Sequence, residues 1–160
     1  MRRLRVRLLA ALVRAPGRTL ALAARYLAHD ARWPRRLGAG PLDDVLASLD
    51  GLPGRRAARL EDVALAIEVG QALSSRLGRR RTCLERALSR YALLREHGHA
   101  PQLVVAVEPD AARRSSEAIG HAWVEVTGRV VPAERLAPLV VSLRHPSHTR
   151  LVPLPGTSSP

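Results

Sequence analysis

The single cysteine of the chain stands where a catalytic nucleophile could form. Cys83 follows Thr82, and Glu85 comes three residues after Thr82. This spacing predicts a capping box, in which the Thr82 hydroxyl and the Glu85 side chain each accept a hydrogen bond from the other residue's amide. Cys83 would then be the first residue of a helix. Free backbone amides and the positive end of the helix dipole favour the thiolate there, which is the reactive form of the side chain.

The sequence around Cys83 supports the same interpretation. Arg79, Arg80 and Arg81 directly precede the predicted cap and add positive potential. A lone cysteine is more often a small buried residue than a nucleophile, so the hypothesis depends on the position of Cys83 and not on its type. The amides of the first helical turn could also bind an oxyanion during acyl transfer.

Among the six histidines, His121 is the best placed to serve as a general base. It begins an alternating segment, so His121, Trp123 and Glu125 should share one face of a strand. An imidazole at that position can accept the proton of a thiol on a neighbouring helix. Trp123 either lines the groove that binds substrate or packs beside the site, and the sequence leaves both open.

A carboxylate should orient the imidazole of His121. If Thr127 and Gly128 form a two-residue hairpin turn, the register places Glu134 opposite His121, close enough for its side chain to reach the ring. Glu125 is the rival, since it lies on the same predicted strand face as His121. We favour Glu134 as the third member of the site and interpret Glu125 as a solvated or structurally paired carboxylate.

These residues must be positioned by helices in the first half of the chain and strands in the second. Hydrophobic spacing and Gly or Pro breakers define the expected elements. The predicted helices are Leu4–Val13, Leu20–His29, Leu42–Leu49, Leu60–Leu77 and a helix that starts at Cys83 and ends near Gly98; the predicted strands are Gln102–Val107, His121–Val126, Arg129–Pro132 and Leu139–Leu143. A breaker region is expected over Arg32–Pro41.

Helices followed by antiparallel strands indicate an α+β fold. We expect a helical N-terminal portion, residues 1–78, that packs on a core of residues 79–152. The Pro- and Ser-rich residues 153–160 are expected to form a disordered tail.

The composition argues against several classes of function. The net charge is +12, but all 26 basic residues are Arg, spread along the chain without interleaved aromatic residues. This pattern is not typical of a nucleic-acid interface, and we expect no nucleic-acid partner. One cysteine excludes an internal disulfide and a cysteine-cluster metal site, and we expect no metal and no cofactor. A cytoplasmic location follows, while the basic, partly apolar segment Met1–Val13 leaves membrane association open.

The segments Thr82–Val107 and His121–Val131 resemble the transglutaminase-like leader peptidases of lasso-peptide biosynthesis, the microcin-processing proteases. The shared features are a helix-initiating Cys-Leu, a Leu-Leu-Arg near a glycine, a valine-rich strand and the sequence His-Ala-Trp-Val-Glu. The resemblance covers about the C-terminal half of the chain. It implies a transglutaminase/papain-like core, with a nucleophile helix packed on a small antiparallel sheet and a site of Cys83, His121 and an acid.

The resemblance also implies a substrate and partners. Family members cut the leader from a ribosomal precursor peptide, after which a macrolactam synthetase closes the ring. In many systems a small separate protein recognises the leader, and the helical N-terminal half of this chain resembles the proteases that depend on one. Where the family usually has Asp about a dozen residues after the His, this chain has Pro132-Ala133-Glu134. Either Glu134 serves instead, or the site is a dyad, or it is impaired.

Two other functions remain open at this point. The chain could be a non-catalytic protein of the same fold whose Arg-rich surface binds an acidic peptide. It could also transfer the acyl group to an amine instead of to water, because both reactions share a thioester step.

The enzyme hypothesis predicts a reactive thiol. Near neutral pH, Cys83 should react with iodoacetamide faster than free cysteine does, because its surroundings favour the thiolate. The rate is measured by mass spectrometry of the folded protein, with the urea-unfolded chain as the control. A Cys83 no more reactive than free cysteine would contradict the enzyme hypothesis.

Overall fold

A computed structural model describes residues 16–55, 57–107, 120–132 and 140–146. The described part of the chain contains four helices and one four-stranded antiparallel sheet, which confirms the α+β class. The elements are α2 (Pro16–Leu37), α3 (Leu42–Asp50), α4 (Leu60–Arg76), α5 (Cys83–Glu96), β1 (Pro101–Val107), β2 (Gly120–Val126), β3 (Arg129–Val130) and β4 (Val140–His145).

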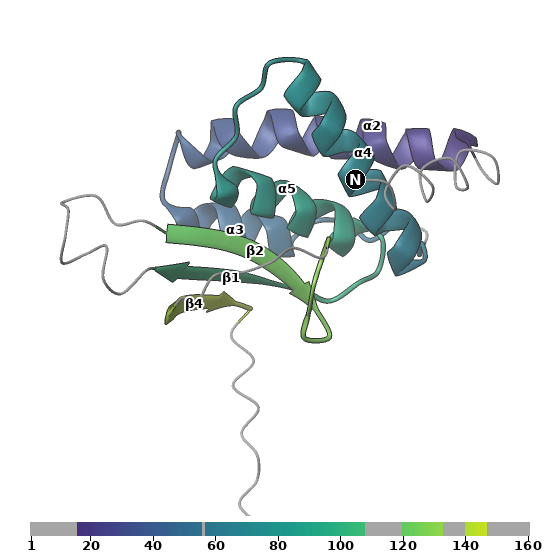
Figure 1. The fold of residues 1–160 in the computed structure, drawn as a ribbon. Helices are drawn as coiled ribbons and strands as arrows, with labels where there is room; N and C mark the ends of the chain where they lie inside the picture. Colours follow the sequence, from purple (N-terminus) through teal and green to yellow (C-terminus); the bar gives the residue numbers. More distant parts are fainter. Residues whose placement is uncertain (1–15, 56, 108–119, 133–139, 147–160) are drawn as a thin grey trace, which may run out of the picture.

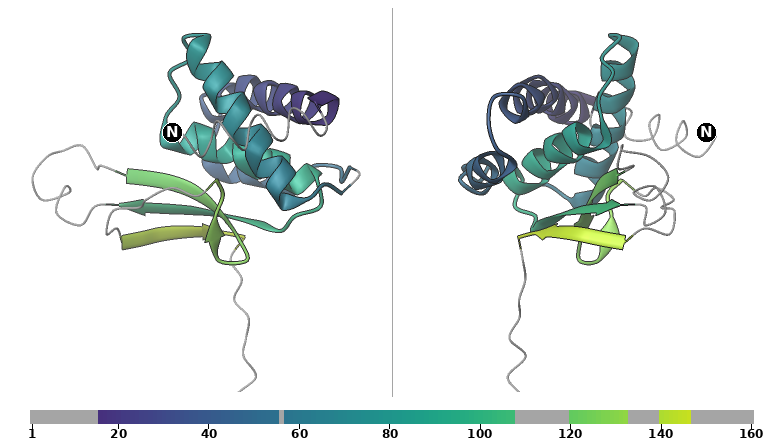
Figure 2. Two further views of the ribbon diagram at one scale, coloured as in Figure 1. Left: turned by 45° about the vertical axis from the view of Figure 1, so that its right-hand side comes forward. Right: turned by 90° about the vertical axis from the view of Figure 1, so that its left-hand side faces the viewer.

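The helices lie on one side of the sheet, as Figure 1 and the rotated views of Figure 2 show. The strand order is β3-β2-β1-β4, so β1 and β2 form the centre of the sheet. A hydrophobic cluster fills the space between the layers and draws residues from α2, α3, α4, α5, β1 and β2. A smaller cluster of Val104, Ala106 and Trp123, with Val130 packed against it, covers the opposite face of the sheet.

Helix α5 is the most deeply buried element. Every residue from Ala87 to Leu94 is buried, so this helix is covered on all sides and not along one stripe. It contacts α2, α3 and α4 as well as β1 and β2. The helix that begins at Cys83 therefore packs on a small antiparallel sheet, as expected, and its surroundings leave little freedom for it to shift.

The expectation of a breaker region over Arg32–Pro41 is wrong for its first part, because α2 continues through Pro34 to Leu37. The helix does end there, and the expected turn follows at residues 38–40 before α3. A proline inside a helix removes one backbone hydrogen bond and costs about 3 kcal/mol. Trp33 offsets that cost: its ring is fully buried in the main cluster and its Nε1 donates to His29 Nδ1 at 3.1 Å. Here the packing of Trp33 in the core outweighs the tendency of Pro34 to end the helix.

The other expected helices and strands within the described residues are present, with small differences at most of their ends. The strand expected over Arg129–Pro132 is shorter, since β3 covers only Arg129–Val130 and the chain bends at Val131 and Pro132. The last strand, expected over Leu139–Leu143, runs over Val140–His145 as β4. The helix expected over Leu4–Val13 and the tail expected over 153–160 lie outside the described residues. The division at residue 78 stays a prediction, although the main cluster joins residues from both sides of it. No helix in the described ranges is long and apolar enough to cross a membrane.

A buried charge network ties α2 to the C-terminal end of α5. The Glu96 carboxylate is 3% exposed and accepts two hydrogen bonds from Arg25, each 3.0 Å long. His29 Nε2 lies 3.1 Å from the same carboxylate. Burial lowers the pKa of His29 below its ordinary value, although Glu96 opposes this shift. Burial alone would raise the pKa of Glu96, but the bonds from Arg25 and His29 outweigh it, and the pKa is lowered.

This network predicts that stability falls on acidification. Below about pH 6.5, unfolded His29 takes up a proton that the folded protein resists, so the unfolded state is favoured. The free energy of unfolding should fall by at most about 1.4 kcal/mol per pH unit as the pH drops from 6.5 toward the lowered pKa of folded His29. Glu96 should add a further loss below its ordinary pKa of 4.5.

Urea unfolding at a series of pH values checks this expectation. His29→Gln should flatten the dependence of the unfolding free energy on pH just below pH 6.5, because the titrating group is gone. Equal slopes for the wild type and His29→Gln would show that His29 is not the source.

Candidate active site

Cys83 is the first residue of α5, and the predicted capping box is confirmed. The Glu85 amide donates to Thr82 Oγ1 at 3.2 Å, and the Thr82 amide donates to Glu85 Oε2 at 2.7 Å. The backbone of Thr82 is extended, with φ −65° and ψ 165°, as a helix cap requires. Two of the end amides are thus satisfied locally, while the amides of Cys83 and Leu84 have no acceptor within the helix.

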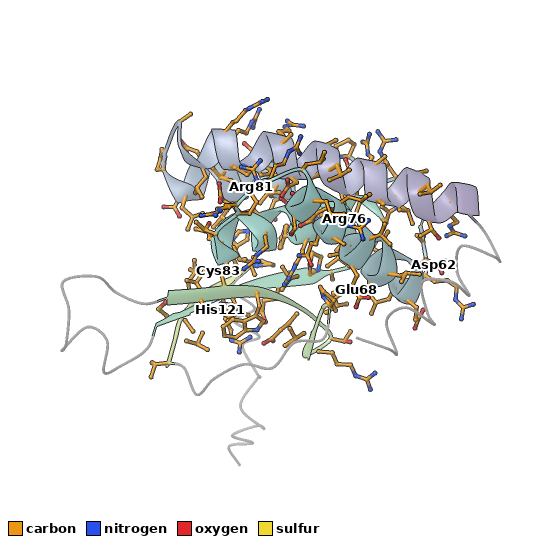
Figure 3. All side chains as sticks on the ribbon, turned by 45° about the horizontal axis from the view of Figure 1, so that its top comes forward. Asp62, Glu68, Arg76, Arg81, Cys83 and His121 are labelled. Atoms are coloured by element: carbon orange, nitrogen blue, oxygen red, sulfur yellow. The ribbon has the colours of Figure 1, made fainter. Side chains whose placement is uncertain are left out.

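The sulfur of Cys83 meets the sheet at the first residue of β2. The half-buried thiol packs against the main cluster and donates to the Gly120 carbonyl oxygen at 3.6 Å. Gly120 directly precedes His121 in the chain. Figure 3 shows Cys83 and His121 at the same end of the sheet, where α5 and β2 both begin.

His121 shares a face of β2 with Trp123. The two rings are stacked with centroids 6.0 Å apart and an interplanar angle of 26°. Ala122 and Val124 alternate with them and pack in the main cluster on the helix side, while Trp123 packs in the smaller cluster on the opposite face. The imidazole therefore stands on the face turned away from α5, and it can approach the sulfur only around the end of the sheet at Gly120.

Trp123 is held firmly beside His121. Its side chain is 4% exposed, and its Nε1 donates to Glu125 Oε1 at 2.8 Å. This burial favours packing beside the site over the lining of a substrate groove, the two alternatives that the sequence leaves open. The ring gives His121 a rigid surface against which the imidazole is oriented.

Glu125 is engaged on both oxygens. Besides accepting from Trp123, it pairs with Arg144 of β4, whose Nη1 lies 3.0 Å from Oε2. The same Arg144 nitrogen donates to Gln102 Oε1 at 3.0 Å. The arrangement matches the interpretation of Glu125 as a structurally paired carboxylate.

Glu134 lies outside the described residues, so its place opposite His121 stays a prediction. The register on which that prediction depends is confirmed as far as it is described: Val126 pairs with Arg129, and the Val131 amide donates to the Val124 carbonyl at 2.9 Å. Thr127 and Gly128 have φ values of 51° and 76°, as a two-residue hairpin turn of this kind requires.

Sequence reasoning missed one charged group close to the site. Asp30 on α2 is 1% exposed and contacts the segment that leads into Cys83 through Arg79 and Arg81. A signal for it exists in the sequence: Asp30 occupies the same helical stripe as the buried Tyr26 and Trp33, where a carboxylate needs a partner. The three arginines before Cys83 were noted only as a source of positive potential.

Comparison with protein families identifies the fold. Residues 27–143 match the model of the transglutaminase-like superfamily, which covers α3, α4 and α5, the second half of α2 and nearly all of the sheet. The chain belongs to the transglutaminase-like superfamily. No curated protein and no solved structure shows significant similarity to it. The superfamily indicates a papain-like cysteine peptidase or acyltransferase kind of function, and both chemistries use a cysteine nucleophile.

The capping box yields a prediction about Thr82. Thr82→Ala should lower the free energy of unfolding by about 1 kcal/mol, because the Glu85 amide loses its acceptor. Thr82→Ser is the matched control and should stay close to the wild type, because it keeps the hydroxyl. Urea unfolding followed by circular dichroism measures both. Equal losses in the two variants would show that the methyl group, and not the hydrogen bond, is responsible.

Proposed function

We propose that this member of the transglutaminase-like superfamily is a cysteine peptidase that removes the leader from a lasso-peptide precursor. The observation that carries the proposal is the placement of Cys83 at the capped start of α5, with its sulfur 3.6 Å from the carbonyl that precedes His121. The family match supports the peptidase or acyltransferase chemistry. The resemblance of the Cys83 and His121 segments to leader peptidases supports the substrate class.

The reaction begins with proton transfer from the Cys83 thiol to His121. The thiolate attacks the scissile carbonyl, and the C–N bond breaks as the imidazolium gives its proton to the leaving amine. The leader remains on sulfur as a thioester. Water, deprotonated by His121, attacks the thioester and releases the leader with a free carboxylate. Glu134 is the residue that we propose holds the imidazole in the orientation for both steps.

The start of α5 can stabilise the charge that forms during this reaction. The first amides of a helix have no partner within the helix, and the helix dipole adds positive potential at this end. In α5 the capping box satisfies the amides of Thr82 and Glu85, and those of Cys83 and Leu84 have no acceptor within the helix. A tetrahedral oxyanion on the carbon bonded to Cys83 would lie against them.

The proposed partners follow from the same substrate class. The precursor peptide would be delivered by a separate leader-recognition protein, since residues 16–100 as described fold into helices and turns and contain no strand-rich module. The cleaved core peptide would pass to a macrolactam synthetase. The positive net charge of +12 would favour association with an acidic peptide or partner surface.

Cleavage of the precursor tests the proposal. The precursor and the recognition protein, taken from the genes beside this one, are incubated with each variant, and the products are followed by mass spectrometry. Cys83→Ala should lower the rate by about 1,000-fold or more, and His121→Ala by about 100-fold or more. Glu134→Gln should lower kcat. Arg129→Ala, a change at an exposed residue of β3 just after the hairpin turn, is the control and should cleave normally.

The outcomes separate the candidate functions. Full cleavage by Cys83→Ala contradicts the peptidase. Unchanged cleavage by Glu134→Gln removes Glu134 from the site and leaves a Cys83–His121 dyad. Formation of a leader amide in the presence of a primary amine, with no hydrolysed leader, indicates acyl transfer to an amine.

A further inference from the structure

A buried carboxylate lies next to the segment that carries Cys83 and has no place in the reaction above. Asp30 of α2 is 1% exposed. Its Oδ2 accepts from Ser74 Oγ at 2.8 Å and lies 3.4 Å from Arg79 Nη1 and 3.4 Å from Arg81 Nε. We refer to Asp30, Ser74, Arg79 and Arg81 as the Asp30 cluster.

The Asp30 cluster acts on the short connection between α4 and α5. Helix α4 ends at Arg76, and the chain turns at Gly78, where φ is +72°. The start of the connection is fixed because the Arg79 amide donates to the Ser74 carbonyl at 3.2 Å. Its end is fixed by the capping box at Thr82. Between the backbone hydrogen bond at Arg79 and the capping box at Thr82, the side chains of Arg79 and Arg81 are held by Asp30.

The contact with Asp30 is long-range, and it joins α2 to the connection. Asp30 precedes Arg81 by 51 residues. The guanidinium groups of Arg79 and Arg81 are only partly exposed, at 36% and 23% for their side chains, so solvent screens the ion pairs incompletely. Figure 3 places Arg81 close to the start of α5, on the side of the helices away from the sheet.

Burying the Asp30 carboxylate costs free energy, which indicates that its charge serves to bind Arg79 and Arg81. An isolated buried carboxylate is strongly unfavourable unless it is paired. Asp30 uses one oxygen for all three contacts, and its Oδ1 has no hydrogen-bond partner in the described part of the chain. A residue selected only for packing would be replaced by an apolar one at lower cost. The feature that an apolar residue could not supply is the hold on the two arginines.

We propose that Asp30 is a positioning residue for Cys83, acting through Arg79 and Arg81 to hold the 79–82 connection and the first turn of α5 in the reactive geometry. The catalytic part of this proposal depends on the peptidase function proposed above. The structural part does not. A small displacement of a nucleophile can cost a large factor in rate, because the attacking atom must approach the carbonyl in one orientation.

The test compares Asp30→Asn with Asp44→Asn. Asparagine keeps the volume of Asp30 and can still accept from Ser74, but it removes the charge that holds the arginines. Asp44 is an exposed residue on α3, so the same chemical change there serves as the matched control. Circular dichroism first establishes that both variants are folded at the temperature of the experiment.

Hydrogen exchange measures the position of the connection without a substrate. In Asp30→Asn, peptides that cover residues 79–86 should exchange about tenfold faster or more than in the wild type, while peptides that cover β1 should be unchanged. Asp44→Asn should match the wild type in both regions. Acceleration spread over the whole chain, or none at residues 79–86, would overturn the proposal.

Kinetics with the precursor measure the consequence for Cys83. In Asp30→Asn, kcat for leader release should fall by about tenfold or more, with KM within about twofold of the wild type, because substrate binding is not altered. In an Arg79→Gln/Arg81→Gln background, Asp30→Asn should cause no further loss of kcat, since the groups through which it acts are absent. If Asp30→Asn lowers kcat in that background by the same factor as in the wild type, the proposal is overturned.

The two proposals can fail separately. If the wild type releases no leader, the peptidase proposal fails, and the exchange comparison still decides whether Asp30 holds the connection. If the wild type is active and Asp30→Asn is unchanged in kcat, the positioning role fails and the peptidase stands.

Discussion

The structure depends on how α5 is held at both of its ends. Every residue of this helix from Ala87 to Leu94 is buried, so this stretch has no solvent-facing side. Even a small movement of the helix would therefore disturb packed side chains. Neighbouring residues of α2 reach its two ends: His29 contacts Glu96 at the C-terminal end, and Asp30 contacts the connection before the N-terminal end. Helix α2 therefore sets the position of α5 along its axis, and with it the position of Cys83.

The sheet supplies the second part of the site through the same helix. Because α5 packs on β1 and β2 and its first residue meets the Gly120 carbonyl, the sulfur is fixed next to the residue that precedes His121. His121 stands on the other face, supported by Trp123, which is itself held by Glu125 and Arg144. Thiol and imidazole thus lie at one edge of the sheet but on opposite faces of it, so the proton transfer that we propose requires the imidazole to reach the sulfur around that edge.

The parts of this arrangement that could be predicted from sequence are those that local signals determine. The capping box requires only Thr82 and Glu85 at a fixed spacing, and the hairpin register follows from Thr127 and Gly128. Both were predicted and are present. The continuation of α2 through Pro34 was not predicted, because it depends on the burial of Trp33 by residues distant in sequence.

Ion pairs between residues that are far apart in the sequence could not be predicted either. Asp30 and Arg81 are 51 residues apart, and Glu125 and Arg144 are 19 apart, so no periodicity in the sequence links either pair. From the sequence, Glu125 could be interpreted as a structurally paired carboxylate, but its partner Arg144 could not be identified. Glu134, which lies outside the described residues, remains a prediction based on the hairpin register alone.

We propose that Cys83 attacks the carbonyl at the junction of the leader and the core peptide. A leader peptide whose C-terminal carboxyl is replaced by a chloromethyl ketone places an electrophile at that position. After incubation with the protein and the leader-recognition protein, digestion and mass spectrometry locate the modified residue. We expect one adduct, on Cys83, and we expect it to form much more slowly in His121→Ala. An adduct on another residue, or none under conditions in which the precursor is cleaved, would contradict it.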